Sequence, residues 1–305
     1  MPLVTDSLMR LISTLAFLAL PLLAGPVALA TEPLSARPTI EVRDGGWGTA
    51  QVSDIETVLG SVSGVLLPYF PGHESDRIQV AFSTQGPHVL LEKSSDGSHR
   101  VILNVRDTRW DQFAYQFSHE LCHIFSNYGQ RALDGGAVAR DHQWFEETLC
   151  EAVSLLTLDW LSANWERSPP HPRWKTYAPA FREYASRLLN QEHRRLPPNA
   201  TIATWYDANR GELETHPYLR DKNELLASAL LPLIQKTPAS LASIAFLNRK
   251  RPVMPATFKA YLEAWYICCP PELRDFVRRL ISLLGEPSRD AGDVTAAAAS
   301  GERFH

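Results

Sequence analysis

The strongest constraint on the fold is a stripe of large apolar side chains that recurs at helical spacing between residues 108 and 129. Its members are Trp110, Phe113, Phe117, Leu121, Ile124 and Tyr128. Residues three and four apart share one face of a helix, so this spacing predicts a helix with one side in the core. Gly129 is suited to end it, because glycine readily adopts the left-handed conformation found after helices. A second helix is expected from about His142 to Leu161.

Three short runs rich in strand-forming residues precede this segment: Arg77–Ser83, His88–Lys93 and His99–Val105. The dipeptide Gly86-Pro87 and the segment Ser94–Gly97 supply turn residues between them. Strands joined by short turns tend to pair with their neighbours in sequence. We therefore expect a small, mostly antiparallel sheet.

The chain after residue 142 reads as helices punctuated by proline. The predicted fold class is α+β. A small, mostly antiparallel sheet lobe is expected over about residues 31–129, and a mainly helical lobe over about residues 142–286. Residues 290–305 are rich in alanine, and we expect them to form a flexible tail.

Residues 1–30 have the pattern of a secretory signal peptide. Arg10 precedes an apolar stretch, and Ala28-Leu29-Ala30 supplies the small residues of a cleavage site. Proline and glycine within the stretch leave an uninterrupted apolar run too short to span a bilayer. We expect an exported protein, periplasmic or extracellular, with no stable membrane anchor after cleavage.

Charge and cysteine content narrow the possible partners. The 305 residues include 30 basic and 34 acidic ones, for a net charge of −4. No run of Lys or Arg occurs, so no nucleic-acid partner is expected. Four cysteines are present: Cys122, Cys150, Cys268 and Cys269. Export would permit a disulfide between Cys122 and Cys150, and a pair of buried thiols is the other possibility.

The first predicted helix carries the motif His119-Glu120-Leu121-Cys122-His123. Histidines at positions i and i+4 project from the same side of a helix, so both imidazoles can reach one zinc ion. The Glu120 carboxylate lies beside them, where it can accept a proton from a zinc-activated water. The motif predicts His119 and His123 as metal ligands, Glu120 as the general base and Zn²⁺ as the cofactor.

A catalytic zinc site needs a third protein ligand and one open position. The second predicted helix contains Glu147 and Glu151, again four residues apart, so both carboxylates face one way. One of them can bind the metal, and the other can accept a hydrogen bond from a liganding histidine. Glu146, Asp141 and His142 are alternative third ligands.

These two segments resemble those of the gluzincins, the thermolysin-like and aminopeptidase branch of the zincin metallopeptidases. In gluzincins, His-Glu-x-x-His is followed along the chain by a glutamate ligand and, one helical turn later, by an acidic residue that supports a ligand histidine. Residues 144–151, Trp-Phe-Glu-Glu-Thr-Leu-Cys-Glu, are similar to the aminopeptidase pattern Trp-Leu-x-Glu-x-Phe-Ala-Glu. The resemblance implies a zincin-like peptidase domain over residues 31–289, in which Glu147 is the third ligand and Glu151 the supporting carboxylate.

The resemblance also implies two features of a substrate cleft. Gluzincins supply a Tyr or His from a later helix to stabilise the oxyanion, and Pro217-Tyr218 is similar to the aminopeptidase segment in which a Pro-Tyr pair opens an apolar helix. Tyr218 is the expected oxyanion donor, with His216 and Tyr206 as alternatives. The strand His99–Val105 is expected to form the cleft rim and pair with substrate. This strand lacks the acidic residue that grips a free amine in aminopeptidases, so aminopeptidase activity is not supported.

The predicted function is that of a secreted or periplasmic zinc-dependent peptidase, a hydrolase acting on a peptide or protein substrate. Two alternatives would use the same residues. One is a zinc-binding interaction module that cleaves nothing, and the other is a zinc hydrolase of a non-peptide amide.

Overall fold

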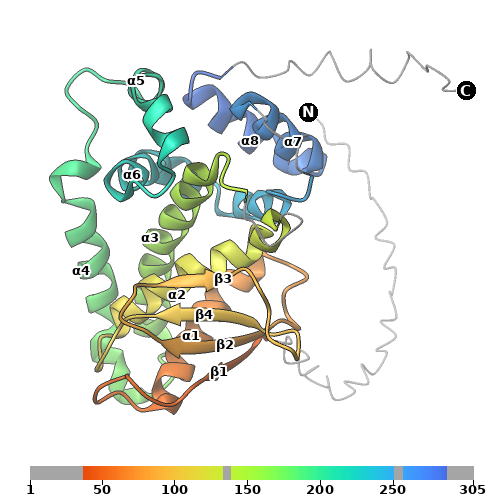
Figure 1. Cartoon of the computed structure of the whole chain (residues 1–305). Coiled ribbons are helices and arrows are strands. Elements are labelled where there is room, and N and C mark those ends of the chain that lie inside the picture. The colour runs from red at the N-terminus through yellow and green to blue at the C-terminus, as the bar shows by residue number, and fades with distance from the viewer. Residues whose placement is uncertain (1–36, 133–138, 251–256, 287–305) are drawn as a thin grey trace, which may run out of the picture. The chain divides into compact units, whose positions relative to one another are not determined.

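The computed structural model describes residues 37–132, 139–250 and 257–286, and Figure 1 shows their arrangement. All of these residues belong to one unit, which spans Ala36–His305. The predicted signal peptide, residues 1–30, and the predicted tail, residues 290–305, lie outside the described residues.

The order of elements confirms the α+β class, because the strands come early in the chain and the remainder is helical. The strands are β1 (Thr39–Val42), β2 (Arg77–Phe82), β3 (His88–Leu90) and β4 (His99–Leu103). The α-helices are α1 (Val52–Leu66), α2 (Trp110–Phe125), α3 (Gln143–Arg167), α4 (Ala178–Leu189), α5 (Ile202–Thr215), α6 (Arg220–Lys236), α7 (Phe258–Cys268) and α8 (Pro271–Leu283). Short 3₁₀ helices connect them: η1 (Leu67–Tyr69), η2 (Tyr128–Arg131), η3 (Pro172–Tyr177), η4 (Glu192–Arg194) and η5 (Pro238–Phe246).

The expectation of a mostly antiparallel sheet is wrong. The strand order is β1-β2-β4-β3, in which β1 and β4 both run parallel to β2 and only β3 is antiparallel to its neighbour β4. Helix α1 carries the chain from β1 back to the starting end of the sheet, which makes β2 parallel to β1. Strand β4 then lies between β2 and β3, so β3 is left at the edge of the sheet.

Helices α1 and α2 cover one face of the sheet and lie behind it in the view of Figure 1. The covered face presents Ile78 and Val80 of β2 together with Val101 and Leu103 of β4, all of them buried. These residues alternate along their strands, as expected when one face of a sheet meets a core. Burying each such side chain stabilises the fold by roughly 1.5–3 kcal/mol relative to leaving it in water.

Helix α2 buries the apolar stripe predicted from the sequence as far as Ile124, and only Tyr128, which lies beyond the helix, is half-buried. The helix ends at Phe125, four residues before the predicted stop at Gly129. Asn127, rather than Gly129, takes the left-handed conformation, with φ of 62°. Its side-chain amide donates to the carbonyl oxygens of Ala245 and Leu247, each at 2.9 Å, which fixes the end of α2 against the segment around η5.

Helix α3 lies in the middle of the described structure and packs against α1, α2, α4 and α6. From Gln143 to Leu158 every residue is buried except Glu147. Because other helices pack against α3 on all sides, apolar and small residues occur around its whole circumference. Glu147 is the one residue of this stretch whose side chain is only partly buried.

No single helix among the described residues is both long and apolar enough to cross a membrane. Only α6 and η5 taken together reach that length and composition, and they are bent by 117°.

Candidate metal centre

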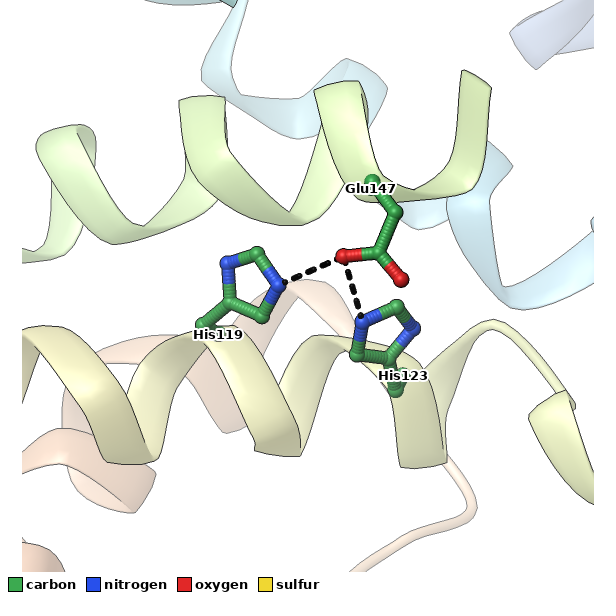
Figure 2. A group of neighbouring side chains, drawn as sticks. All are labelled: His119, His123 and Glu147. Carbon is green, nitrogen blue, oxygen red and sulfur yellow. Dashed lines mark hydrogen bonds and ion pairs between the residues drawn. The ribbon is translucent and has the colours of Figure 1, made fainter. Parts of the chain in front are cut away.

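Helices α2 and α3 bring His119, His123 and Glu147 together (Figure 2). The two histidines lie one turn apart on the side of α2 that faces α3, and the side chain of Glu147 projects toward them from α3. Helical periodicity places both imidazoles on one side, because residues four apart are neighbours on a helix surface. The packing of α2 on α3 supplies the third group.

The distances from Glu147 to the two histidines are close to those between ligand atoms of a tetrahedral metal ion. Oε2 of Glu147 lies 3.1 Å from Nε2 of His119 and 3.5 Å from Nε2 of His123. Two ligand atoms that are each about 2.1 Å from a tetrahedral zinc ion lie about 3.4 Å apart. One ligand atom from each residue falls within 4.8 Å of the other two, so a single cation can contact all three.

A buried carboxylate holds the other nitrogen of His123. Nδ1 of His123 lies 2.8 Å from Oε1 of Glu146, and that carboxylate also accepts hydrogen bonds from Ser126, Arg131 and Asn248. A carboxylate at Nδ1 fixes the imidazole tautomer and leaves Nε2 as the metal-binding atom. Burial alone would raise the pKa of Glu146, but Arg131 and His123 outweigh it and lower that pKa to about 2.

Glu151, the predicted supporting carboxylate, lies near His119 but makes no hydrogen bond to it. Its Oε2 is 3.9 Å from Nδ1 of His119, which is an ion-pair distance rather than a hydrogen bond. Tyr115 donates its hydroxyl to the same oxygen at 2.5 Å, and Arg194 contacts Oε1 at 2.8 Å. The carboxylate is therefore held in position by groups on both sides.

The carboxylates around the histidines control their protonation. Burial lowers the pKa of an imidazole, yet the hydrogen bond with Glu147 and neighbouring negative charge raise the pKa of His119 above its ordinary value. The pKa of His123 is raised further, because Glu147 and Glu146 together outweigh its burial. The pKa of Glu147 is lowered, since both histidines outweigh the effect of burial on it. The same negative charge would favour a divalent cation in place of those protons.

Glu120 lines the same cavity as the three clustered residues and is almost fully buried. Burial raises the pKa of its carboxyl group, and the nearby His119 and His123 oppose that rise. A carboxylate with a raised pKa accepts a proton more readily near neutral pH. Its place next to the cluster therefore suits a general base.

The cluster opens into a cavity of about 300 Å³. Its lining residues come from edge strand β3, from α2 and α3, and from the start of α6. The cavity is lined by Pro87, His88, Val89, Tyr115, Gln116, His119, Glu120, His123, Tyr128, Gln143, Glu147, Glu151, Tyr218, Arg220, Asn223 and Glu224. Cavities of this size with a few convergent polar groups are typical of ligand-binding sites.

Tyr218 is the one predicted oxyanion donor that lines the cavity. The residue is 54% exposed. Asn223 donates to the carbonyl oxygen of Pro217 at 2.8 Å, which anchors the turn that carries Tyr218. Of the alternatives, Tyr206 is buried against Trp144, and neither it nor the exposed His216 is part of the cavity lining.

The prediction that the strand His99–Val105 forms the rim of the cleft is wrong. Strand β4, which contains most of the predicted segment 99–105, is paired on both sides and has no free edge for a substrate. Strand β3 is an edge strand, and its residues His88 and Val89 line the cavity, together with Pro87 just before it. Sequence patterns do not predict this arrangement, because it depends on β4 lying between β2 and β3. For the same reason, they do not predict His88 and Arg220 as cavity residues.

The alternative third ligands have other contacts. Glu146 is committed to His123, Ser126, Arg131 and Asn248. His142 contacts Glu214 through Nδ1 at 2.7 Å, and neither it nor Asp141 is in the group that can share an ion with the two histidines.

A second group with metal-like spacing consists of His193, Asp221 and Glu224. Glu224 already contacts Nε of Arg220 at 2.6 Å and Nη2 of Arg194 at 3.0 Å. Two guanidinium groups at one carboxylate would repel a further cation, so we assign this group to an ion-pair network rather than to a metal site.

The four cysteines are free thiols. Cys122 and Cys150 are buried where α2 packs on α3. Burial raises the pKa of the Cys150 thiol well above its ordinary value, which keeps the thiol protonated and unreactive.

Taken together, the site offers two imidazoles, an ionised carboxylate, a buried second carboxylate and an adjacent hydroxyl around one cavity. This combination suits hydrolysis assisted by a metal ion. A comparison with known protein families finds none that matches this chain, and a comparison with curated proteins finds no match either.

Proposed function

We propose that the protein is a zinc-dependent peptidase in which His119, His123 and Glu147 hold the ion. The observation that carries this proposal is the convergence of one ligand atom from each residue within 4.8 Å, next to a buried glutamate and a cavity. Zinc suits two imidazoles and one carboxylate with an open fourth position. The proposal includes export of the chain after loss of residues 1–30, which rests on the sequence pattern.

The chain's own residues account for the proton transfers and the charge stabilisation. A zinc ion, when bound, supplies a Lewis acid that activates water at neutral pH. Glu120 accepts the proton of the attacking water and passes it to the leaving amine. Tyr218 donates its hydroxyl to the oxygen of the tetrahedral intermediate. Glu146 and Glu151 keep the two imidazoles oriented while this happens.

Strand β3 provides a place for the peptide backbone. It is an edge strand, so its outer N–H and C=O groups are not used within the sheet. A substrate in extended conformation can add to that edge and lie across the cavity above Glu120. We propose that the substrate is bound in this way.

The test combines metal analysis with a digestion assay. Purified protein should contain about one zinc per chain, and it should hydrolyse denatured casein in a reaction that a chelator stops and added zinc restores. Glu120→Gln should abolish hydrolysis and keep the zinc, because the change removes the base and leaves the ligands. Glu147→Ala should lose most of the zinc.

Glu166 offers a matched control on α3, since its side chain is exposed at the far end of that helix. Glu166→Gln and Glu166→Ala should leave zinc content and activity unchanged. Full zinc in Glu147→Ala would reject the ligand assignment. Zinc binding without cleavage of peptides would favour the interaction-module alternative, and cleavage of non-peptide amides alone would favour the other.

A further inference from the structure

Arg220 stands apart from the other residues that line the cavity. Among the described residues of the lining, it is the one whose side chain is positively charged at every accessible pH. It is the first residue of α6 and follows the turn that carries Tyr218. Its side chain is 72% exposed, although it borders the same cavity as the proposed metal ligands.

A neighbouring carboxylate fixes the direction of the Arg220 side chain. Nε of Arg220 donates to Oε1 of Glu224, one turn along α6, at 2.6 Å. The other oxygen of Glu224 contacts Arg194 at 3.0 Å and His193 at 2.6 Å, so Glu224 is itself held from the opposite side. The described residues show no partner for the two Nη groups of Arg220.

Stability does not account for this arrangement. An ion pair with an exposed arginine contributes little to folding, because solvent screens the charge and the long side chain must be ordered. Glu224 also has Arg194 as a buried counter-charge without Arg220. The contact through Nε orders the guanidinium group of Arg220 and leaves its two Nη groups available to bind a ligand.

The acidic groups of the cavity are already engaged. Glu147 faces the two histidines, Glu151 is paired with Arg194, and Glu224 is paired with both arginines. Glu120 is needed as the base. Arg220 is thus the group of the lining that can pair with a charged part of the substrate. Its Nη edge matches a carboxylate, which it can bind through two parallel hydrogen bonds.

We propose that Arg220 binds a carboxylate of the substrate, so that the enzyme selects peptides with a carboxylate close to the scissile bond. This inference rests on the proposed peptidase function. A cavity of about 300 Å³ holds only a few residues, so the carboxylate must lie within about two residues of the bond, at about 3.3 Å per extended residue. An acidic side chain and a free C-terminus share this chemistry.

The test measures binding in the Glu120→Gln background, where peptides bind without being cut. Peptides spanning a casein bond that the wild type cleaves are made in four forms. Two have Asp or Asn near the bond, and two have a free or an amidated C-terminus next to the bond. We expect the peptides with a carboxylate to bind at least about tenfold tighter, as charge-assisted bonds to an arginine imply. Asp against Asn tests the side-chain source, and acid against amide tests the C-terminal source.

Arg220 variants test whether that preference belongs to this residue. Arg220→Gln should abolish the preference, and Arg220→Glu should turn it toward peptides with Lys at the same position. Arg182→Gln is the matched control, because Arg182 is an exposed arginine paired with Asp159 away from the cavity. It should keep the preference, and Arg220→Gln and Arg182→Gln should both keep a thermal midpoint close to that of the wild type.

The possible outcomes separate the two proposals. If the wild type cleaves peptides but the Glu120→Gln variant binds all forms within twofold of one another, the role of Arg220 alone is overturned. A preference that survives Arg220→Gln overturns it as well. A wild type that binds zinc and cleaves no peptide overturns the proposed function and this inference with it.

Discussion

Replacing Glu146 by leucine should destabilise the protein strongly, because it leaves a buried positive charge without its partner. Arg131 and Glu146 are both fully buried, and Nε of Arg131 lies 2.6 Å from Oε2 of Glu146. Removing one member of a buried ion pair typically costs about 3–5 kcal/mol. Arg131 keeps contacts with two backbone carbonyl oxygens at 3.1 Å, those of Ala139 and Asp141. We therefore expect a loss near the lower end, about 3 kcal/mol.

The other groups that contact Glu146 should add little to this loss. His123 loses the contact at Nδ1 but keeps Glu147 at 3.5 Å from its Nε2, and two further donors, Ser126 and Asn248, each keep a second partner. Ser126 Oγ also contacts the carbonyl oxygen of His123 at 3.0 Å, and Asn248 Nδ2 also donates to the carbonyl oxygen of Ser126 at 3.0 Å. Both donors therefore keep one partner when the carboxylate is removed. The expected cost comes mainly from the unpaired guanidinium group.

Urea unfolding followed by circular dichroism, with excess chelator present, measures the effect without a contribution from metal binding. With an m-value of about 3 kcal/mol/M, a loss of about 3 kcal/mol lowers the midpoint by about 1 M. The double variant Glu146→Leu with Arg131→Met removes both charges and should recover most of the stability. Glu166→Leu, at an exposed position, should shift the midpoint little.

Two results would refute this reasoning. One is a midpoint for Glu146→Leu close to that of the wild type, which would mean that the Arg131 charge is not dependent on its partner. The other is a double variant no more stable than the single one. The isosteric change Glu146→Gln tests the link to the metal: it should weaken zinc binding by about 10–100-fold, because it weakens the support of His123.

Two further predictions concern the cavity. Tyr218→Phe should lower kcat by about 10²–10³ with little change in zinc content, since the hydroxyl acts on the reacting oxygen and the ring is exposed; an unchanged kcat would remove Tyr218 from the mechanism. Ion pairs with Arg220 and Arg194 outweigh burial and lower the pKa of Glu224. Its carboxylate therefore stabilises the fold at any pH above the unfolded pKa of about 4.3, and this contribution is lost as the pH falls from there through the folded pKa. The stability difference between wild type and Glu224→Gln, measured by thermal unfolding, should therefore shrink between pH 6 and pH 3, and a constant difference would contradict it.

Local patterns in the sequence were sufficient for the helices that carry the candidate ligands. The apolar stripe of α2 places His119 and His123 on one side, and the four-residue spacing of Glu147 and Glu151 places both carboxylates toward α2. These relations depend only on helical periodicity, which acts over a few residues. The same is true of the α+β class, which follows from the order of strand-like and helix-like segments.

The sheet and the buried arginines depended on contacts between distant parts of the chain. Short strands and turns do not determine which strands pair, and the insertion of β4 beside β2 reversed the expected arrangement. Arg131 and Arg194 look like surface residues in the sequence, yet each lies buried against an acidic residue of α3. These two ion pairs form only when the segments that carry the arginines pack against α3, and local sequence patterns do not specify that packing.

The burial of α3 on all sides has a consequence for how this protein can change. Over residues 143–158 the helix has no outer surface on which substitutions could accumulate without harm, apart from the position of Glu147, which faces the cavity. Every side chain there is part of an interface with another element. Variation in a population of related chains should therefore fall on α8 or α4, which have water on one side, and hardly at all on this stretch.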